Sequence, residues 1–443
     1  MKESGCRMYV AVDDTDSCRG MCTTYLLAKM IAEMPYDLIG MPRLVRLNPA
    51  VPWKTRGNGA LSMRIGIGGG ERTLVGESRG HEIFCYSYLK EEPNAKEVLH
   101  WASRYLDDNA EPDANPGLIV SLLKPPQRLY WSGVRDILLM DDVKTILSGM
   151  GALIYSKGNG RGVIGAACGM AWRPRDRTLE LLAYRPRERW GTDRYLDPDS
   201  VERMDSETVS TFNNIEIRRR KVAISPSTPC PVLYGIRGED REELLTARRM
   251  LVSEEPEMWL IFMTNQGTDD HMVKDAATLL PNRSYRLKAT VAGRARDQRG
   301  GHVFIPVRCE HGIIECAAYE PSKEFRSLIR ALRPGDVVEV MGELRETPRS
   351  LNLEKVRVLE IAESRIKTAN PRCPRCGRAM KSVGRDAGYR CRNCSVYLSE
   401  EQAPTEPESR QLVPGWYEPP VCSRRHLSKP LCRMGEYQPI DFV

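Results

Sequence analysis

The pattern of apolar and polar positions predicts a strand, a polar turn and a helix at the start of the chain. Residues 10–12 form a short apolar run typical of a buried strand, and residues 13–17 are polar. Apolar side chains then recur at helical spacing at Leu26, Leu27, Met30 and Ile31.

The same pattern continues through the N-terminal part of the chain. Strands are expected at 38–47 and 60–67, and helices at 81–89 and 95–106, which indicates an α/β or α+β domain over residues 1–117. A strand at 118–123, a helix at 134–147 and strands at 152–155 and 162–172 follow. This order is typical of a ferredoxin-like unit, which we expect over residues 118–195.

Residues 196–278 form a further α+β segment. A strand at 232–236, a helix at 241–251 and a strand at 259–263 are expected there. The pattern leaves open whether this segment completes the catalytic domain or the ferredoxin-like domain.

A run of strand signals then predicts a β-barrel over residues 279–365. Five short strands with one helix, at 324–332, between the third and fourth fit an OB-fold. The strands are expected at 285–291, 302–307, 312–319, 336–342 and 351–358. OB-folds commonly bind single-stranded or loop RNA, although such a barrel can also serve only as a spacer.

Two Cys-x-x-Cys pairs predict a zinc ribbon within residues 366–443. They are separated by 14 residues, and four thiolates can surround one tetrahedral Zn²⁺ in a closed structural site. The predicted ligands are Cys373, Cys376, Cys391 and Cys394. Cys422, His426 and Cys432 could form a second site, but their irregular spacing favours solvent-exposed or core positions.

Composition and charge refine this division. The 443 residues are too many for one core, and the net charge of +7 is unevenly distributed. Residues 281–443 hold 29 Lys and Arg against 20 Asp and Glu, whereas residues 1–280 hold 37 against 39. We therefore expect chemistry in the N-terminal part and polyanion binding in the C-terminal part.

The sequence gives no sign of a membrane or secretory segment. The first residues lack the apolar stretch of a signal peptide, and no apolar run is long enough to cross a bilayer. Most of the 14 cysteines are scattered singly, as small apolar residues rather than as a disulfide framework. We therefore expect a cytoplasmic protein with no membrane partner.

The polar turn after the first strand carries the candidate chemistry. Asp13, Asp14 and Asp16 would repel one another unless a cation sits among them, and Mg²⁺ shares such oxygen ligands with substrate phosphates. The alternative is a solvated acidic turn with a helix cap.

Two further loops are candidate binding elements. Lys157, Gly158, Asn159, Gly160 and Arg161 could contact phosphate or RNA through backbone N–H groups and two cations, or could form an ordinary hairpin turn. A second polar stretch at 264–271, after a predicted strand, contains Asp269 and Asp270. Ligands commonly bind at such strand ends, although a plain loop fits equally well.

Four motifs together resemble a known family. These are 13–17, 19–24, 157–162 and 264–269, ahead of an OB-fold and a zinc ribbon. In this combination the chain resembles the archaeal tRNA 2-agmatinylcytidine synthetases over nearly its whole length. No P-loop and no protein-kinase signature is present, so an unrelated ATP site is implied.

The resemblance implies a multidomain α+β protein and an ATP-dependent C–N bond-forming ligase. The expected domains are an N-terminal α/β kinase-like catalytic domain, a ferredoxin-like domain, an OB-fold and a zinc ribbon. The enzyme would attach agmatine to carbon 2 of the wobble cytidine in an isoleucine tRNA with a CAU anticodon. The modified base would then read AUA instead of AUG.

The resemblance also implies roles for individual residues. Thr23 corresponds to a threonine that is autophosphorylated in the family, and it lies near a helix N-terminus that favours phosphate. The aspartates would hold Mg²⁺-ATP, with one as a general base, and Lys157 and Arg161 would supply positive charge. Asp269 or Asp270 would pair with the agmatine guanidinium.

Two other functions fit parts of the sequence. Asp14 and Asp16 have the Asp-x-Asp spacing of a haloacid-dehalogenase-like phosphatase, but Cys18 stands where Thr or Val is expected. That interpretation also leaves the C-terminal modules without a use. A non-catalytic tRNA-binding protein would use the C-terminal modules for affinity, with the acidic turn as a structural feature only.

Overall fold

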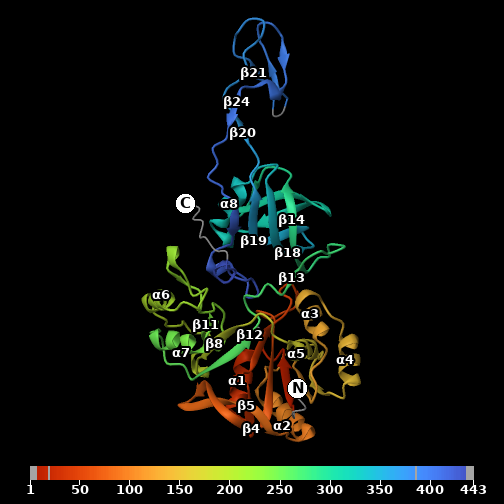
Figure 1. Cartoon of the computed structure of the whole chain (residues 1–443), viewed down its shortest axis with the longest axis vertical. Coiled ribbons are helices and arrows are strands. Elements are labelled where there is room, and N and C mark those ends of the chain that lie inside the picture. The colour runs from red at the N-terminus through yellow and green to blue at the C-terminus, as the bar shows by residue number, and fades with distance from the viewer. Residues whose placement is uncertain (1–6, 18–19, 385–386, 436–443) are drawn as a thin grey trace.

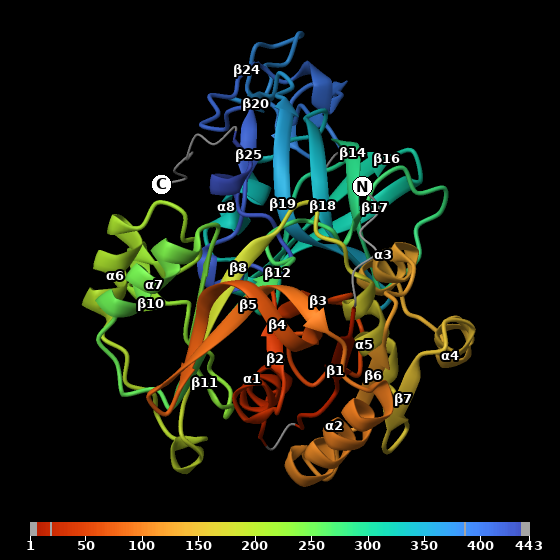
Figure 2. The same cartoon turned by 60° about the horizontal axis from the view of Figure 1, so that its bottom comes forward.

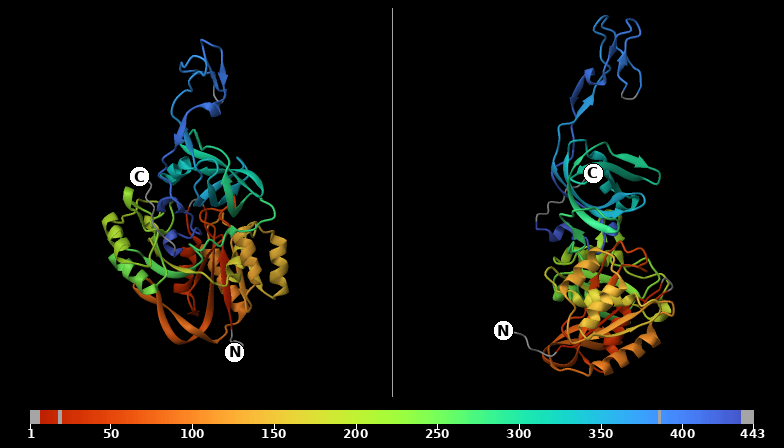
Figure 3. Two further views of the ribbon diagram at one scale, coloured as in Figure 1. Left: turned by 45° about the horizontal axis from the view of Figure 1, so that its top comes forward. Right: turned by 90° about the vertical axis from the view of Figure 1, so that its right-hand side faces the viewer.

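The computed structural model describes residues 7–17, 20–384 and 387–435. Figure 1 shows three parts along the long axis: a large sheet with helices, a β-barrel, and a small cysteine-rich ribbon at the far end. Figure 3 shows the same succession from the side. None of the helices in the described ranges is both long and apolar enough to span a membrane.

A ten-stranded sheet forms the N-terminal part. Eight strands follow the order β11-β8-β12-β3-β4-β1-β6-β7, and β2 and β5 pair with each other and with β4. The strands are β1 (Tyr9–Asp13), β2 (Asp37–Ile39), β3 (Arg43–Arg46), β4 (Gly59–Ser78), β5 (His81–Glu91), β6 (Gly117–Ser121), β7 (Leu153–Ser156), β8 (Thr178–Tyr184), β11 (Val232–Gly238) and β12 (Met258–Thr264).

Seven helices cover this sheet (Figure 2). They are α1 (Thr23–Glu33), α2 (Ala95–Asn109), α3 (Gln127–Arg135), α4 (Met140–Gly149), α5 (Gly162–Ala171), α6 (Pro198–Glu207) and α7 (Arg241–Met250). A short pair, β9 (Ile215–Glu216) and β10 (Lys221–Val222), follows α6.

Alternation along the strands divides the core between the two faces. Val10 and Val12 of β1 pack in one cluster with α1 and α2, whereas Tyr9 and Ala11 pack in another with α3, α4 and α5. A third cluster joins β8, β11 and β12 to α6 and α7. Strands from residues 1–117, 118–195 and 196–278 thus share one sheet, and the predicted domain boundaries stay a prediction.

Two expected elements were wrong. Residues 81–89 lie in strand β5, where Ile83 and Cys85 alternate inward and the strand pairs with β4. Residues 162–171 form helix α5 in place of the expected strand. The prediction was wrong because a continuous apolar run does not distinguish a buried strand from a buried helix. The small residues of α5 allow close packing: a Cβ added to Gly117 of β6 would lie 1.9 Å from the Val163 nitrogen.

The expected helix over 134–147 is two helices, α3 and α4. The order from residue 117 is therefore β6, α3, α4, β7, α5, β8, in place of the expected strand-helix-strand-strand order.

The OB-fold strands and helix are confirmed. Five strands close into a barrel through the pairings β14–β18–β19–β17–β16 and β16–β14, and α8 lies between the third and fourth strands. The elements are β13 (Met272–Val273), β14 (Arg283–Val291), β15 (Arg296–Gln298), β16 (His302–Cys309), β17 (Gly312–Ala318), α8 (Phe325–Ala331), β18 (Val337–Arg345) and β19 (Ser350–Glu360).

The ribbon stands on a two-stranded stalk, and the chain then returns to the barrel (Figure 1). The stalk pairs β20 (Arg365–Lys367) with β24 (Thr405–Pro407), and the ribbon contains β21 (Lys381–Ser382), β22 (Tyr389–Arg390) and β23 (Tyr397–Leu398). Strand β25 (Gly415–Tyr417) then pairs with β19 of the barrel. The chain after β25 forms backbone hydrogen bonds with the loop that follows β12 of the large sheet.

Candidate active site

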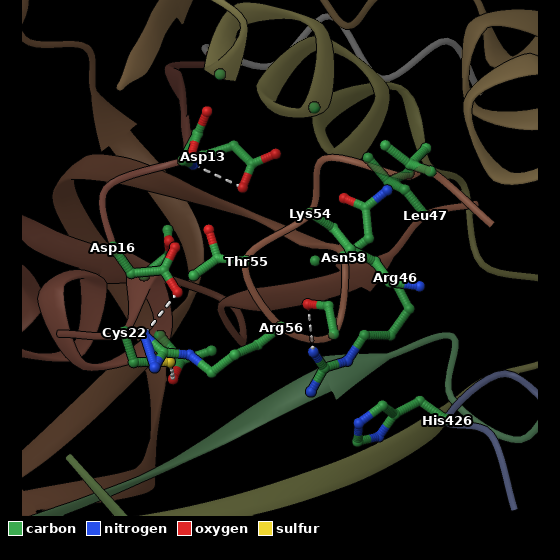
Figure 4. A pocket seen from close by; sticks show the side chains of 18 of the residues that line it. Asp13, Asp16, Cys22, Arg46, Leu47, Lys54, Thr55, Arg56, Asn58 and His426 are labelled. Atoms are coloured by element: carbon green, nitrogen blue, oxygen red, sulfur yellow. Dashed lines mark hydrogen bonds and ion pairs between the residues drawn. The ribbon is translucent and has the colours of Figure 1, made fainter. Parts of the chain in front are cut away.

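A pocket of about 880 Å³ lies where the acidic turn meets the N-terminus of α5. Its walls come from the turn after β1, the loop between β3 and β4, strands β8 and β11, and residues 223–232. Figure 4 shows Asp13 and Asp16 on one side of this pocket and His426 on another, with Arg46 and Arg56 between them.

The three predicted aspartates line one end together. The Asp14 backbone N–H donates to Asp13 Oδ1 over 2.8 Å, and Asp14 has a left-handed φ of +57°. Burial, then the charge of Asp14, raises the pKa of Asp13 well above its usual value. Burial and the charge of Asp16 raise the pKa of Asp14 to about 6, and Arg161 opposes that shift. Carboxylate oxygens are the donors that a divalent cation takes, but the three carboxylates do not converge into one ligand-sized group in the described residues, so a cation would have to draw them together.

Helix α5 approaches this cluster without any side chain in between. A Cβ added to Gly165 would lie 1.7 Å from Asp13 Oδ2, and one added to Gly162 would lie 2.5 Å from the Asp13 carbonyl oxygen. Only glycine at these positions lets the helix N-terminus face the carboxylates, where its dipole favours negative charge.

Thr23 begins α1 and lines the same end of the pocket. The Thr15 hydroxyl donates to Thr23 Oγ1 over 3.2 Å, and the Thr15 backbone N–H lies 3.4 Å from the same atom. A hydrogen bond from Thr23 also lowers the pKa of Asp16, against the larger effect of burial, which raises it. Thr23 therefore lies directly beside the acidic cluster.

Arg56 was not among the site residues predicted from the sequence, yet its side chain forms hydrogen bonds that fix the acidic turn. Its Nη2 donates to Asp16 Oδ2 over 2.9 Å and to the carbonyl oxygens of Ser17 and Gly20 over 3.1 and 3.0 Å, and it also contacts the Met21 carbonyl. No local pattern marks this role, because Arg56 lies 40 residues from Asp16 in the chain.

The residues at the opposite end of the pocket were not predicted from the sequence either. Glu180 of β8 is buried and pairs with Arg237 over 3.0 Å and with Arg46 over 3.8 Å. Gln266 donates its amide to the same carboxylate, and His426 reaches this end from the C-terminal segment. The one sequence signal for this end of the pocket was a carboxylate, that of Glu180, within an apolar segment typical of a strand.

The predicted loop 157–161 is only partly in the pocket. Asn159 and Arg161 line it, and Arg161 lies over the Trp53 ring at 3.9 Å from its centroid. Lys157, Gly158 and Gly160 do not line it, and Lys157 pairs instead with Asp107. Gly158 and Gly160 adopt left-handed φ values of +58° and +69°, which shape the turn before α5.

Asp269 and Asp270 lie outside the pocket lining. Asp269 pairs with Lys355 of β19 over 2.7 Å. Asp270 accepts a hydrogen bond from Tyr130 of α3 over 2.5 Å. The structure thus brings the predicted aspartates, Thr23, Asn159 and Arg161 together, and places these two carboxylates elsewhere.

The four predicted cysteines converge. Their Sγ atoms all lie within 4.8 Å of one another, as metal ligands must. Backbone N–H groups, that of Cys394 foremost, lower the pKa of Cys391 to about 7, whereas a hydrogen bond with Cys376 raises the pKa of Cys394 to about 11, so one thiol of the group releases its proton much more readily than another. Within the described ranges this is the one such group, so Cys422, His426 and Cys432 do not form a second.

These parts define the class of the protein: a multidomain protein with an OB-fold barrel, a four-cysteine ribbon and a separate pocket that has aspartates at one end and cationic side chains at the other. Residues 285–361 match the family model of an OB-fold nucleic acid binding domain. Residues 9–159 match the TiaS TCKD domain, residues 160–271 the TiaS FLD domain, and residues 370–411 the TiaS C-terminal zinc ribbon domain.

Relatives over the full length agree with these matches. The chain is 41% identical to TiaS of Archaeoglobus fulgidus, a 2-agmatinylcytidine synthetase for an isoleucine tRNA, over 97% of this chain and 98% of that one. The TiaS of Methanocaldococcus jannaschii is 36% identical, over 96% of this chain and 98% of that one. The chain belongs to the TiaS family of tRNA 2-agmatinylcytidine synthetases.

Solved structures resemble the whole chain as well. A crystal structure of TiaS with its isoleucine tRNA and ATP is 37% identical with a TM-score of 0.82, over 97% of this chain and 98% of that one. A crystal structure of TiaS with the same tRNA, AMPCPP and agmatine is 36% identical with a TM-score of 0.80, over the same shares.

Proposed function

We propose that this protein is an ATP-dependent ligase that attaches agmatine to carbon 2 of the wobble cytidine in an isoleucine tRNA with a CAU anticodon. The observation that carries the proposal is full-length family membership combined with a pocket of about 880 Å³ that has three aspartates at one end. That volume is within the range of ligand pockets in proteins. The product tRNA reads AUA in place of AUG.

The reaction requires activation of a poor leaving group. The carbonyl oxygen at carbon 2 of cytidine accepts a phosphoryl group from ATP, and the amine of agmatine then attacks carbon 2 and displaces phosphate. Phosphoryl transfer depends on positioning and on charge neutralisation. Asp13, Asp14 and Asp16 would hold Mg²⁺, which would supply charge neutralisation for the ATP phosphates, and one of these aspartates serves as general base. Asn159 and Arg161 face the same end of the pocket, where Arg161 supplies positive charge.

Thr23 accepts the γ-phosphoryl group of ATP on its hydroxyl oxygen, which releases ADP and passes the hydroxyl proton to a neighbouring aspartate. Its position at the N-terminus of α1, next to Asp16, supports this role, because a helix N-terminus stabilises negative charge. Lys157 contributes from outside the pocket lining, by contact with phosphate or RNA.

The two N-terminal units are a kinase-like catalytic domain and a ferredoxin-like domain. The ferredoxin-like domain was expected over residues 118–195, but β8, β11 and β12 with α6 and α7 on one face lie within residues 178–264. This arrangement favours the alternative in which residues 196–278 complete the ferredoxin-like domain. The OB-fold binds RNA, the ribbon and the ferredoxin-like domain contact the tRNA body, and the four-cysteine site would hold Zn²⁺.

Asp269 and Asp270 remain the predicted partners of the agmatine guanidinium. Their present contacts with Lys355 and Tyr130 would have to give way for that role.

The experiment is incorporation of radiolabelled agmatine into an unmodified CAU-anticodon isoleucine tRNA transcript. We expect label on the RNA that requires ATP and Mg²⁺ and is lost in Asp14→Asn. A matched control is Asp108→Asn, an exposed position on α2, which should retain activity. Tight tRNA binding without incorporation would instead establish a non-catalytic binding protein.

A further inference from the structure

The chain after β25 crosses from the barrel to the large sheet. We call residues 418–434 the return segment. The Gly267 backbone N–H donates to the His426 carbonyl and the Asp269 N–H to the Leu427 carbonyl, both over 2.8 Å. Leu427 is 2% exposed and packs in the core cluster that contains α3 and α5. The return segment is therefore fixed to the module that carries the pocket.

A buried lysine secures the same segment to the barrel. Lys355 of β19 is fully buried, and its Nζ donates to Asp269 and, over 2.6 Å, to the Lys429 carbonyl oxygen. The Lys429 N–H donates to Asp269 Oδ1 over 2.7 Å. This ion pair thus joins the barrel to the loop after β12 and to the return segment, together with the contacts His271–Glu354 and Arg425–Glu343.

This arrangement brings the His426 ring to the wall of the pocket opposite the aspartates (Figure 4). His426 Nδ1 lies 2.8 Å from Gln266 Oε1 and 3.1 Å from Arg237 Nη2. The Gln266 amide nitrogen must face the Glu180 carboxylate, which only accepts, so its oxygen faces His426. Arg237 only donates, so its contact and that of the Gln266 oxygen require opposite tautomers of the ring. We assign the hydrogen to Nδ1 on the shorter contact, which leaves the lone pair on Nε2.

Nε2 is available to a ligand. His426 is exposed to the pocket, but desolvation of its ring by the surrounding pocket wall, then the charges of Arg46 and Arg237, lowers the pKa of His426, which favours the neutral ring. Nε2 has no hydrogen-bond partner among residues 7–17, 20–384 and 387–435, and the Nε2 edge of the ring faces the loop before β4. A Cβ added to Gly57 in that loop would lie 3.3 Å from Nε2. The imidazole thus presents an acceptor to the pocket.

The charged side chains around the His426 end of the pocket limit which ligand groups can donate a hydrogen bond to Nε2. Arg46, Arg237 and Lys54 stand against the single carboxylate of Glu180. This excess of positive charge disfavours a cationic donor such as agmatine, so a donor that meets a lone pair at Nε2 has to be a neutral N–H group. A cytosine offers its exocyclic 4-amino group, whereas uracil presents an acceptor at that position.

We propose that His426 is a specificity-determining residue that accepts a hydrogen bond from the 4-amino group of the target cytosine through Nε2. The proposal rests on the proposed function. In a pyrimidine, O2 and the 4-amino group lie on opposite sides of the ring. A base whose O2 faces the aspartate end therefore turns its amino group toward the His426 end.

Three substitutions separate the acceptor from the structural contacts. His426→Asn can retain the donor to Gln266 but lacks an atom at Nε2, whereas His426→Gln can place an oxygen near Nε2. His426→Ala removes both. His100→Ala is the matched control, because His100 is exposed on α2.

The readout is the affinity for two transcripts that differ only at the wobble base, cytidine or uridine, measured by filter binding. We expect His426→Ala and His426→Asn to weaken binding of the cytidine transcript about 10-fold, or about 1.4 kcal/mol. Binding of the uridine transcript and the KM values for ATP and agmatine should change less than about 2-fold, and His426→Gln should restore part of the preference.

Equal weakening for both transcripts, or an unchanged preference in His426→Asn with a wild-type melting temperature, would overturn the proposal. Because binding needs no turnover, these results stand apart from the agmatine incorporation assay. Loss of incorporation in the wild-type protein would refute the proposed function and would leave the comparison of transcripts interpretable.

Discussion

Neutralising Asp14 should stabilise the ligand-free protein while removing its function. Burial and the charge of Asp16 raise the pKa of Asp14 from 3.8 to about 6, so its carboxylate is disfavoured in the folded state. This penalty is complete above pH 6 and fades as the pH falls toward 3.8. After allowance for solvent screening at this half-buried position, Asp14→Asn should raise the free energy of unfolding by about 1–2 kcal/mol at pH 7.5.

The assay is thermal unfolding with and without Mg²⁺-ATP. The gain corresponds to a rise of about 2–6 °C in Tm for a module of this size, and it should shrink at pH 4.5, where Asp14 is already largely protonated. Wild-type protein should gain about 2.7 kcal/mol with Mg²⁺-ATP at 100 times Kd, whereas Asp14→Asn should gain nothing. The affinity of the wild-type protein for the divalent cation should rise with pH through about 6.

Asp108→Asn is the control for any general effect of losing one negative charge, since Asp108 is exposed on α2. A lower Tm for ligand-free Asp14→Asn at pH 7.5 would refute the argument that the aspartates repel one another. A full Mg²⁺-ATP shift in that variant would refute the cation site.

Three further substitutions test other parts of the structure. Arg56→Met removes the donor to Asp16 and to three carbonyl oxygens, so urea unfolding should show a loss of about 2–3 kcal/mol, and an unchanged midpoint would contradict this. Gly165→Ala places a Cβ 1.7 Å from Asp13 Oδ2, so ATP binding by calorimetry should fall at least about 10-fold; near-wild-type binding would show that α5 can shift. Cys376→Ser should lower the zinc content, measured by mass spectrometry, and weaken tRNA binding while ATP binding stays unchanged. Loss of ATP binding in this variant would contradict the separation of ribbon and pocket.

The ribbon and the return segment require separate experiments. Removal of 366–443 as a unit deletes the cysteines together with His426, so lost activity would not distinguish tRNA binding from pocket integrity. The Cys376→Ser variant avoids this, because it leaves Lys355 and its contacts with Asp269 and Lys429 in place.

The sequence by itself determined the features that depend on short-range patterns. The OB-fold strands follow from alternation along neighbouring segments, and the four ribbon cysteines follow from ligand spacing. The acidic turn was visible because its three carboxylates are within four consecutive residues. Each of these signals lies within one element or one hairpin.

Tertiary structure decided what depends on distant packing. Residues 162–171 form a helix whose small side chains let it approach β1 and β6 closely. Periodicity alone could not distinguish this helix from a strand, because the run is wholly apolar. Arg56, Glu180 and His426 line one pocket with the acidic turn, across 40 to more than 400 residues of chain. Their contribution depends on burial and on partners brought together only by folding, because a charge or an imidazole acquires its role from the groups that surround it.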